Sequence, residues 1–276
     1  MQQNTQLKTI GPQAAHLLAQ LQERRHLIFA LPEVVEITGL KAASARSFIR
    51  TLVQRGVAAR LRPGLFNLVP FELGQDKEYL GNPYVVAREL VRGHDYFISH
   101  ASAMEIHRMT TQPQLVVYAT SPRPPRNRKI FGTEFRFVRC PPARFFGFTE
   151  HWATNEEKVR VSDLERTVLD GVRLPRRCGG ITEVAKGFWM RRSDIDAKKL
   201  VDYALRLDCG SALGRLGYLM ELLEIGIASD LDALRRKLSS AYALLDPVLP
   251  REGKFIAKWR LRLNVSPDEL RAVLHT

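Results

Sequence analysis

The sequence predicts a mixed α/β protein of the α+β kind, with a small N-terminal module and a larger mixed α/β domain whose last third is helical. Its 276 residues are enough for two domains of about 100 to 200 residues each. Apolar residues recur at helical spacing early in the chain, helix and strand patterns alternate in its middle, and helical patterns dominate its end. We therefore divide the chain into residues 1–82 and residues 83–276.

The composition indicates a basic protein that attracts a polyanion. Lys and Arg number 42 against 29 Asp and Glu, which leaves a formal net charge of +13. Nucleic acid or an acidic partner protein suits this surplus. The three cysteines form no CxxC pair, and no apolar stretch reaches the roughly 18 to 20 residues that cross a bilayer. We therefore expect a cytoplasmic protein with reduced thiols and no membrane partner.

The N-terminal module begins with three predicted helices. Residues 11–27 carry apolar side chains at three- and four-residue spacing, with Pro12 in the first turn. A short helix follows at residues 31–39 and ends at Gly39, which suits a left-handed cap. Residues 42–55 form a third helix with one apolar face.

A β-hairpin is predicted directly after the third helix. Residues 57–69 form two short strands around the turn Arg62-Pro63-Gly64. Three helices with a tight turn between the last two, followed by a basic hairpin, resemble a winged helix-turn-helix. We therefore expect residues 1–82 to bind double-stranded DNA through the third helix and the hairpin.

The candidate DNA-binding residues lie in a segment without acidic residues between Glu36 and Glu72. At about 100° per residue, the polar positions of the third helix point away from its apolar face and are free to enter a major groove. Arginines of the hairpin suit phosphate or minor-groove contacts. The predicted contact residues are Lys41, Ser44, Arg46, Ser47, Arg50, Thr51, Arg60 and Arg62.

The second domain is predicted to mix helices and strands before it becomes helical. Its first half has helix patterns at residues 83–91 and 101–109, and strand patterns at 96–99, 114–120, 131–138 and 144–149. Helices follow at residues 164–172, 182–190, 197–207, 212–223 and 231–244. A strand at 255–263 and a helix capped by Ser266 end the chain.

One pattern points to enzyme chemistry. The pair Gly179-Gly180 precedes Asp194-Ile195-Asp196, and nucleotidyltransferases place two glycines before an acidic pair that binds divalent metal. The same acids suit a helix start, with Ser193 as the cap and Asp196 in the first turn. We favour the helix start, and the metal-dependent nucleotidyltransferase stays the alternative.

The histidines and the remaining motifs give no catalytic set. His94, His100 and His107 lack the three- or four-residue spacing of a zinc-binding pair, so we expect hydrogen-bonded structural histidines. The sequence contains no phosphate-binding loop, nucleophile elbow or dinucleotide fingerprint. We predict no catalytic residue, no metal and no cofactor.

Two further runs carry a family resemblance over about residues 30–190. They are Ser99-His100-x-Ser102-Ala103-x-x-x-His107 and Ser162-Asp163-x-Glu165-Arg166-Thr167-x-x-Asp170, in which Ser162 is the expected helix cap. With the winged helix and the Arg/Pro-rich loop after a strand, they resemble the AbiEi-type antitoxin family of type IV toxin-antitoxin (abortive infection) systems. Family members usually have glycine after the second histidine, where this chain has Arg108.

The resemblance implies a function in transcription regulation and toxin neutralisation. Such antitoxins repress their own operon by binding inverted repeats in the operator DNA, and their larger domain counteracts a cognate nucleotidyltransferase toxin. We therefore expect a DNA-binding repressor and antitoxin rather than an enzyme, with direct contact to the toxin left open. Besides the nucleotidyltransferase that uses Asp194 and Asp196, a ligand-sensing regulator with a deep apolar pocket in the second domain stays open.

Overall fold

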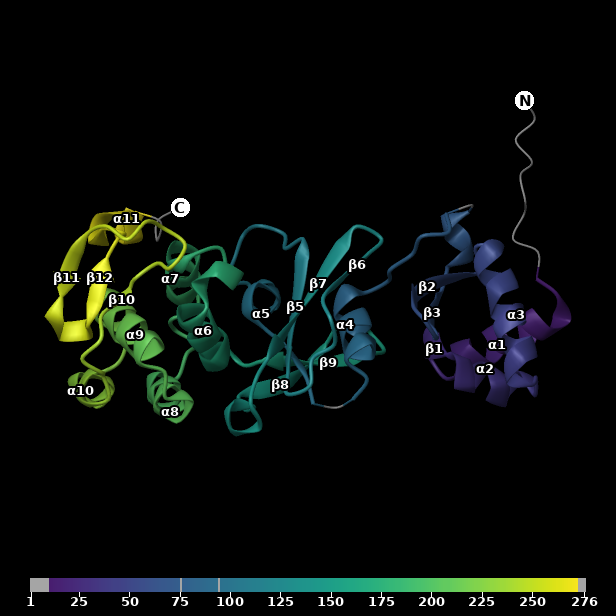
Figure 1. Cartoon of the computed structure of the whole chain (residues 1–276), viewed down its shortest axis with the longest axis horizontal. Coiled ribbons are helices and arrows are strands. Elements are labelled where there is room, and N and C mark those ends of the chain that lie inside the picture. Colours follow the sequence, from purple (N-terminus) through teal and green to yellow (C-terminus); the bar gives the residue numbers. More distant parts are fainter. Residues whose placement is uncertain (1–9, 75, 94, 273–276) are drawn as a thin grey trace, which may run out of the picture. The chain divides into compact units, whose positions relative to one another are not determined.

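The structure is a computed structural model that describes residues 10–74, 76–93 and 95–272, and it confirms the mixed α/β class (Figure 1). The chain forms two compact units. The first unit comprises the described residues up to Arg92 together with 128–133 and 152–158, and the second comprises the rest. In the described ranges, no helix has both the length and the apolar character that crossing a membrane requires.

Three helices and a short sheet build the core of the first unit. The elements are α1 (Pro12–Glu23), β1 (Ile28–Ala30), α2 (Leu31–Thr38), α3 (Ala42–Gln54), β2 (Ala58–Arg62) and β3 (Leu65–Leu68). The sheet is antiparallel with the order β1-β3-β2, and the helices lie on one side of it (Figure 1). Apolar side chains from both layers form one buried cluster.

The first predicted helix was too long. It ends at Glu23, four residues before its predicted end, and strand β1 begins at Ile28. Strand β1 pairs with the hairpin strand β3, a partner more than thirty positions away that local periodicity does not register. After the hairpin come a 3-10 turn (Phe71–Leu73) and α4 (Pro83–Val91), whose first turn is capped by Asn82.

The middle of the chain forms the larger sheet, with the strand order β6-β7-β5-β4-β9-β8. Its strands are β4 (Phe97–Ile98), β5 (Val116–Ser121), β6 (Arg128–Ile130), β7 (Thr133–Arg139), β8 (Phe148–Trp152) and β9 (Lys158–Ser162), and helix α5 (His100–Ile106) follows β4. Strand β9 was not predicted. The strand predicted to start at Arg144 starts later, because Pro142–Arg144 form a 3-10 turn.

The last part of the chain is mainly helical, as predicted. Its helices are α6 (Leu164–Arg173), α7 (Ile181–Met190), α8 (Ala197–Leu207), α9 (Gly210–Leu222), α10 (Ala228–Arg236) and α11 (Pro267–Ala272), with a 3-10 turn at Pro175–Arg177. A small sheet of order β10-β12-β11 contains β10 (Ala243–Leu244), β11 (Lys254–Ile256) and β12 (Leu261–Leu263). Ser266 and Glu269 cap α11 reciprocally, as predicted.

Two predictions in this region were wrong. The helix predicted to reach residue 244 ends at Arg236, because residues 243–244 pair with β12. The strand predicted over residues 255–263 is two antiparallel strands around a 3-10 turn, Ala257–Trp259. That turn packs closely on α9: a Cβ at Gly214 would clash with the carbonyl of Trp259, and one at Gly217 with its indole ring. Glycine at both positions therefore allows the small sheet to dock on α9.

The first family-like run attaches α5 to the larger sheet. The Ser102 hydroxyl donates to the Val116 carbonyl (3.2 Å) and accepts the Tyr118 N–H (2.9 Å). His107 Nε2 lies 2.6 Å from the Ser162 carbonyl oxygen, which ties the end of α5 to β9. Arg108 follows with φ +56°, a left-handed conformation that favours glycine.

The second run anchors the start of α6. The predicted cap was wrong by one residue: Ser162 ends β9, and the Asp163 carboxylate accepts the Arg166 N–H (2.8 Å). Glu165 accepts the Asp196 N–H (3.0 Å) and the Lys199 ammonium (2.8 Å), which ties α6 to α8. These contacts give the run a structural role, because they set where α6 begins and how α8 lies against it.

The acidic pair of the enzyme alternative lies at a helix start, and neither acid is on a strand. Asp196 is the cap of α8, where its carboxylate accepts the Lys199 N–H at 3.0 Å. Asp194 forms an ion pair with Arg191 at 2.9 Å. The cap predicted at Ser193 is thus three residues too early. His94 lies outside the described residues.

We expect Asp196→Ala to lower the free energy of unfolding by about 0.5 to 2 kcal/mol, because the first turn of α8 loses its side-chain cap. Urea denaturation followed by circular dichroism measures the change. Asp202→Ala, at an exposed position inside the same helix, is the matched control and is expected to change stability little. Equal effects of the two substitutions would contradict the capping role.

His100 makes stability depend on pH. Burial lowers the pKa of this histidine to about 4, below the value of about 6.5 in an unfolded chain. As the pH falls from about 6.5 to 4, His100 becomes protonated in the unfolded chain but stays neutral in the folded protein. The free energy of unfolding therefore falls by about 3 kcal/mol. His100→Asn, which tolerates the φ of +53°, removes this contribution. Urea denaturation at several pH values measures the free energy of unfolding of both proteins. An equal dependence on pH in the two would contradict the assignment to His100.

Candidate nucleic-acid interface

Helix α3 presents a polar face above a buried apolar one. Ala45, Ile49 and Leu52 are buried in the core of the first unit. The 3.6-residue repeat then places Arg46 and Arg50 on the outer side, where both are exposed. The helix ends after Gln54, and the chain turns through Gly56 (φ +69°) into β2.

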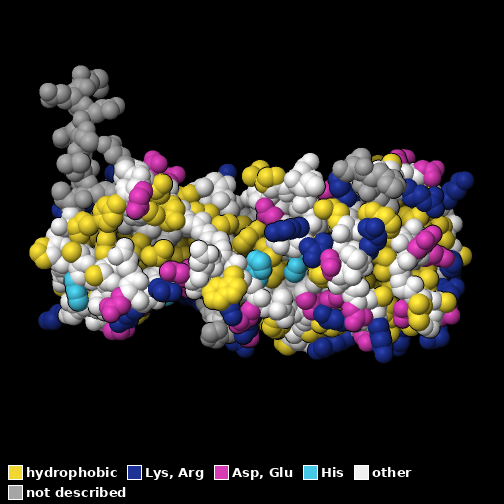
Figure 2. All heavy atoms as spheres, turned by 180° about the vertical axis from the view of Figure 1, so that it is seen from behind, with side chains coloured by type: hydrophobic (Ala, Val, Ile, Leu, Met, Phe, Trp, Pro, Cys, Tyr) yellow, Lys and Arg dark blue, Asp and Glu magenta, His cyan; other side chains and the backbone are white. Residues whose placement is uncertain are grey.

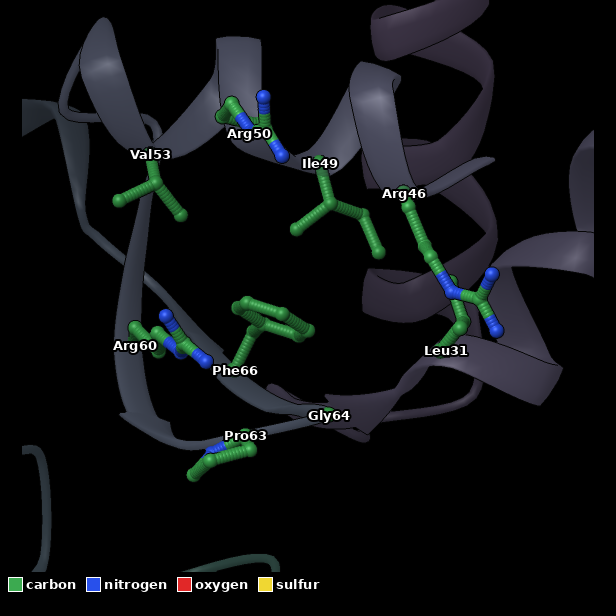
Figure 3. Close-up of a pocket in the computed structure, with 9 residues that line it drawn as sticks. All are labelled: Leu31, Arg46, Ile49, Arg50, Val53, Arg60, Pro63, Gly64 and Phe66. Carbon is green, nitrogen blue, oxygen red and sulfur yellow. The ribbon is translucent and has the colours of Figure 1, made fainter. Parts of the chain in front are cut away.

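The hairpin brings a third arginine to the same place. A hollow of about 460 Å³ lies between α3 and the hairpin, and its lining includes Arg46, Arg50 and Arg60 (Figure 3). Arg60 is exposed on β2, and the turn that closes the hairpin passes through Pro63 and Gly64. In the register of β2 against β3, Arg60 lies opposite Phe66. This register brings Arg60 to the hollow.

No carboxylate within the described ranges forms an ion pair with these three arginines. The acids of the first unit that precede α3 are engaged elsewhere: Glu36 pairs with Arg24 (2.9 Å), Glu33 pairs with His26 (3.0 Å), and Glu23 accepts from the Gln20 amide (3.0 Å). Three uncompensated guanidinium groups around one hollow attract a polyanion, and each offers a planar fork to phosphate oxygens or to guanine.

The remaining predicted contact residues do not line the hollow. Lys41, Ser44 and Ser47 are exposed on α3 or at its start. The Thr51 hydroxyl donates to the Ser47 carbonyl (3.2 Å) within the helix. Arg62 is half-buried, its Nη1 donates to the Pro63 carbonyl (3.2 Å), and burial lowers the pKa of its guanidinium.

Sequence reasoning missed the apolar part of the lining of the hollow. It consists of Leu31, Ile49, Val53 and Phe66, which lie around the hollow together with the arginines (Figure 3). Val53, on the apolar face of α3, and Phe66, on β3, remain half-exposed. The signal available was the position of Val53 at the edge of the apolar face of α3, one turn beyond Ile49.

Comparisons with known proteins give a fold and no family. The crystal structure of the RV2827C protein from Mycobacterium tuberculosis resembles this chain with a TM-score of 0.69 and 16% sequence identity, over 97% of this chain and 96% of that one. At this identity the likeness shows the fold alone, and it includes the residues after Leu207. No protein-family model matches the sequence, and no curated protein matches it.

Proposed function

We propose that the chain is a DNA-binding repressor and antitoxin of the AbiEi type, in which the first unit acts as a winged helix-turn-helix. The observation that carries the proposal is the convergence of Arg46 and Arg50 from α3 with Arg60 from β2 around one hollow. In this assignment α3 enters the major groove and the β2-β3 hairpin is the wing.

The geometry supports a division of labour among the three arginines. Arg46 and Arg50 lie on the outer face of a helix, the element that fits a major groove about 12 Å wide. Arg60 lies on a hairpin strand and suits a phosphate. The absence of acids from residue 37 to residue 71 keeps the whole surface attractive to DNA.

The antitoxin part of the proposal rests on the family-like runs. They lie in the second unit and hold its sheet and helices together, so the second unit is the part we assign to neutralising a cognate nucleotidyltransferase toxin. Repression and neutralisation then use different residues and are separable by substitution.

Binding to the DNA upstream of the gene is expected to weaken steeply with salt, because each neutralised phosphate releases counterions. We expect Arg50→Ala to weaken operator binding by about 1 to 3 kcal/mol with little change on scrambled DNA, and Arg60→Ala to weaken both. Gel-shift titrations at several salt concentrations measure this. Arg236→Ala, an exposed arginine of α10, is the charge-matched control. Salt-independent binding, or equal losses in all three variants, would refute the interface.

Replacing Arg46, Arg50 and Arg60 together by alanine is expected to abolish repression and to spare neutralisation. A promoter fusion measures the first, and growth of cells that express the neighbouring toxin measures the second. Circular dichroism checks that the variant is folded. Loss of growth rescue in a folded variant would place neutralisation in the first unit and contradict the proposed division.

A further inference from the structure

A second cationic hollow lies in the second unit, between α9 and the small sheet β10-β12-β11. Its volume is about 380 Å³, and its lining includes Arg215, Tyr242, Arg251, Phe255 and Arg262. Figure 2 shows Lys and Arg side chains over the C-terminal part on the face drawn, with Asp and Glu among them. Positive charge is therefore widespread there. The hollow differs from the rest of this surface in the way its arginines and aromatic rings are arranged.

Arg215 is a buried cation held by neutral groups. It is 5% exposed, its Nε donates to the Leu244 carbonyl (2.9 Å), and its Nη1 donates to the Val172 carbonyl (3.0 Å). Among the described residues no carboxylate forms an ion pair with it. The acid that acts on it electrostatically, Asp246, has its two oxygens occupied by the N–H groups of Ile181 and Val248. Burial lowers the pKa of this guanidinium.

A buried guanidinium without an anion is costly, because carbonyl dipoles replace only part of its lost hydration. The two carbonyls fix the plane of the group, so an anion that enters the hollow meets a cation already oriented. Two further arginines, exposed Arg251 and half-buried Arg262, line the same hollow. Neither forms an ion pair with a described carboxylate, and Arg262 Nε is held by the Gly253 carbonyl (3.3 Å).

Two exposed aromatic rings stand beside the three arginines. Tyr242 is 42% exposed and Phe255 is 62% exposed, and their rings meet edge to face with centroids 5.1 Å apart. Because the two rings adjoin, they form one exposed apolar patch, the kind of surface that a ligand or partner covers. The Arg262 guanidinium lies 5.1 Å from the centroid of the Phe255 ring, so cation and ring present a joint surface.

We infer that this hollow binds a nucleotide, with its phosphate on Arg215, Arg251 and Arg262 and its base against Tyr242 and Phe255. Charge alone would suit any anion, and the adjacent rings select an anion that carries a flat aromatic group. The hollow has room for a single nucleotide, which is either free or part of a single strand. None of these residues belongs to the proposed DNA interface, so the two sites can be tested separately.

Calorimetric titration of the full chain with adenosine monophosphate, inorganic phosphate and adenosine tests the site. The nucleotide is expected to bind more tightly than either fragment. Arg251→Ala and Arg262→Ala together are expected to weaken it about tenfold or more, since each removes a charged contact to phosphate. Phe255→Ala is expected to weaken binding of the nucleotide and to leave binding of phosphate unchanged. Arg236→Ala on α10 is expected to change neither affinity.

A short single-stranded oligoribonucleotide in the same titration separates the two sources of the nucleotide. Binding of the oligomer that depends on Arg251 supports the site and assigns it to a strand, while binding of the monophosphate alone assigns it to a free nucleotide. Equal affinity for phosphate and nucleotide would overturn the role of the rings. No binding by the wild type, or binding unaffected by the exposed single variant Arg251→Ala, would overturn the site.

Discussion

The second unit depends on one fully buried guanidinium, that of Arg166. It is 0% exposed and forms an ion pair with Asp170 at 3.1 Å. Its Nη1 donates to the carbonyls of Arg144 (2.9 Å) and Phe146 (3.0 Å), and the group lies over the rings of Phe97 and Phe146. These partners offset the cost of burying the charge. Helix α6 must therefore sit against β4 and the chain before β8, and α7, α8 and α9 pack around α6.

The same constraint explains what the family-like runs do. Arg166 and Asp170, which form the buried ion pair, belong to the second run. The main-chain carbonyl of Ser162, also in the second run, accepts a hydrogen bond from His107 of the first run. Both runs thus encode the internal contacts that join α5, β9 and α6. The proposed DNA contacts lie on residues outside these runs. Residues of the proposed interface can therefore be substituted without removing these internal contacts.

The sequence was most informative where several local signals agree, although single cap positions were wrong by one to three residues. Helix α8 has the predicted bounds, because periodicity and an acidic start coincide there, and the outer face of α3 was predicted from periodicity alone. Strands β1, β9 and β10 were missed because distant partners stabilise them. Arg60 lines the same hollow as Arg46 because of the register of the hairpin, which the sequence does not specify. Arg215, which lines the other hollow, belongs to no recognisable sequence motif. Neither hollow was therefore predictable.

The two cationic hollows differ in how they would discriminate between anions. Arg46, Arg50 and Arg60 are exposed, so their electric field extends into solvent and is screened by salt. Such a surface favours a long polyanion, because many counterions are released when it binds. Arg215 is desolvated and fixed by two carbonyls, so it acts at short range on a group small enough to enter. A duplex is too wide to reach it. The basic surplus of the chain is therefore consistent with two anionic partners of different size, one bound by each unit.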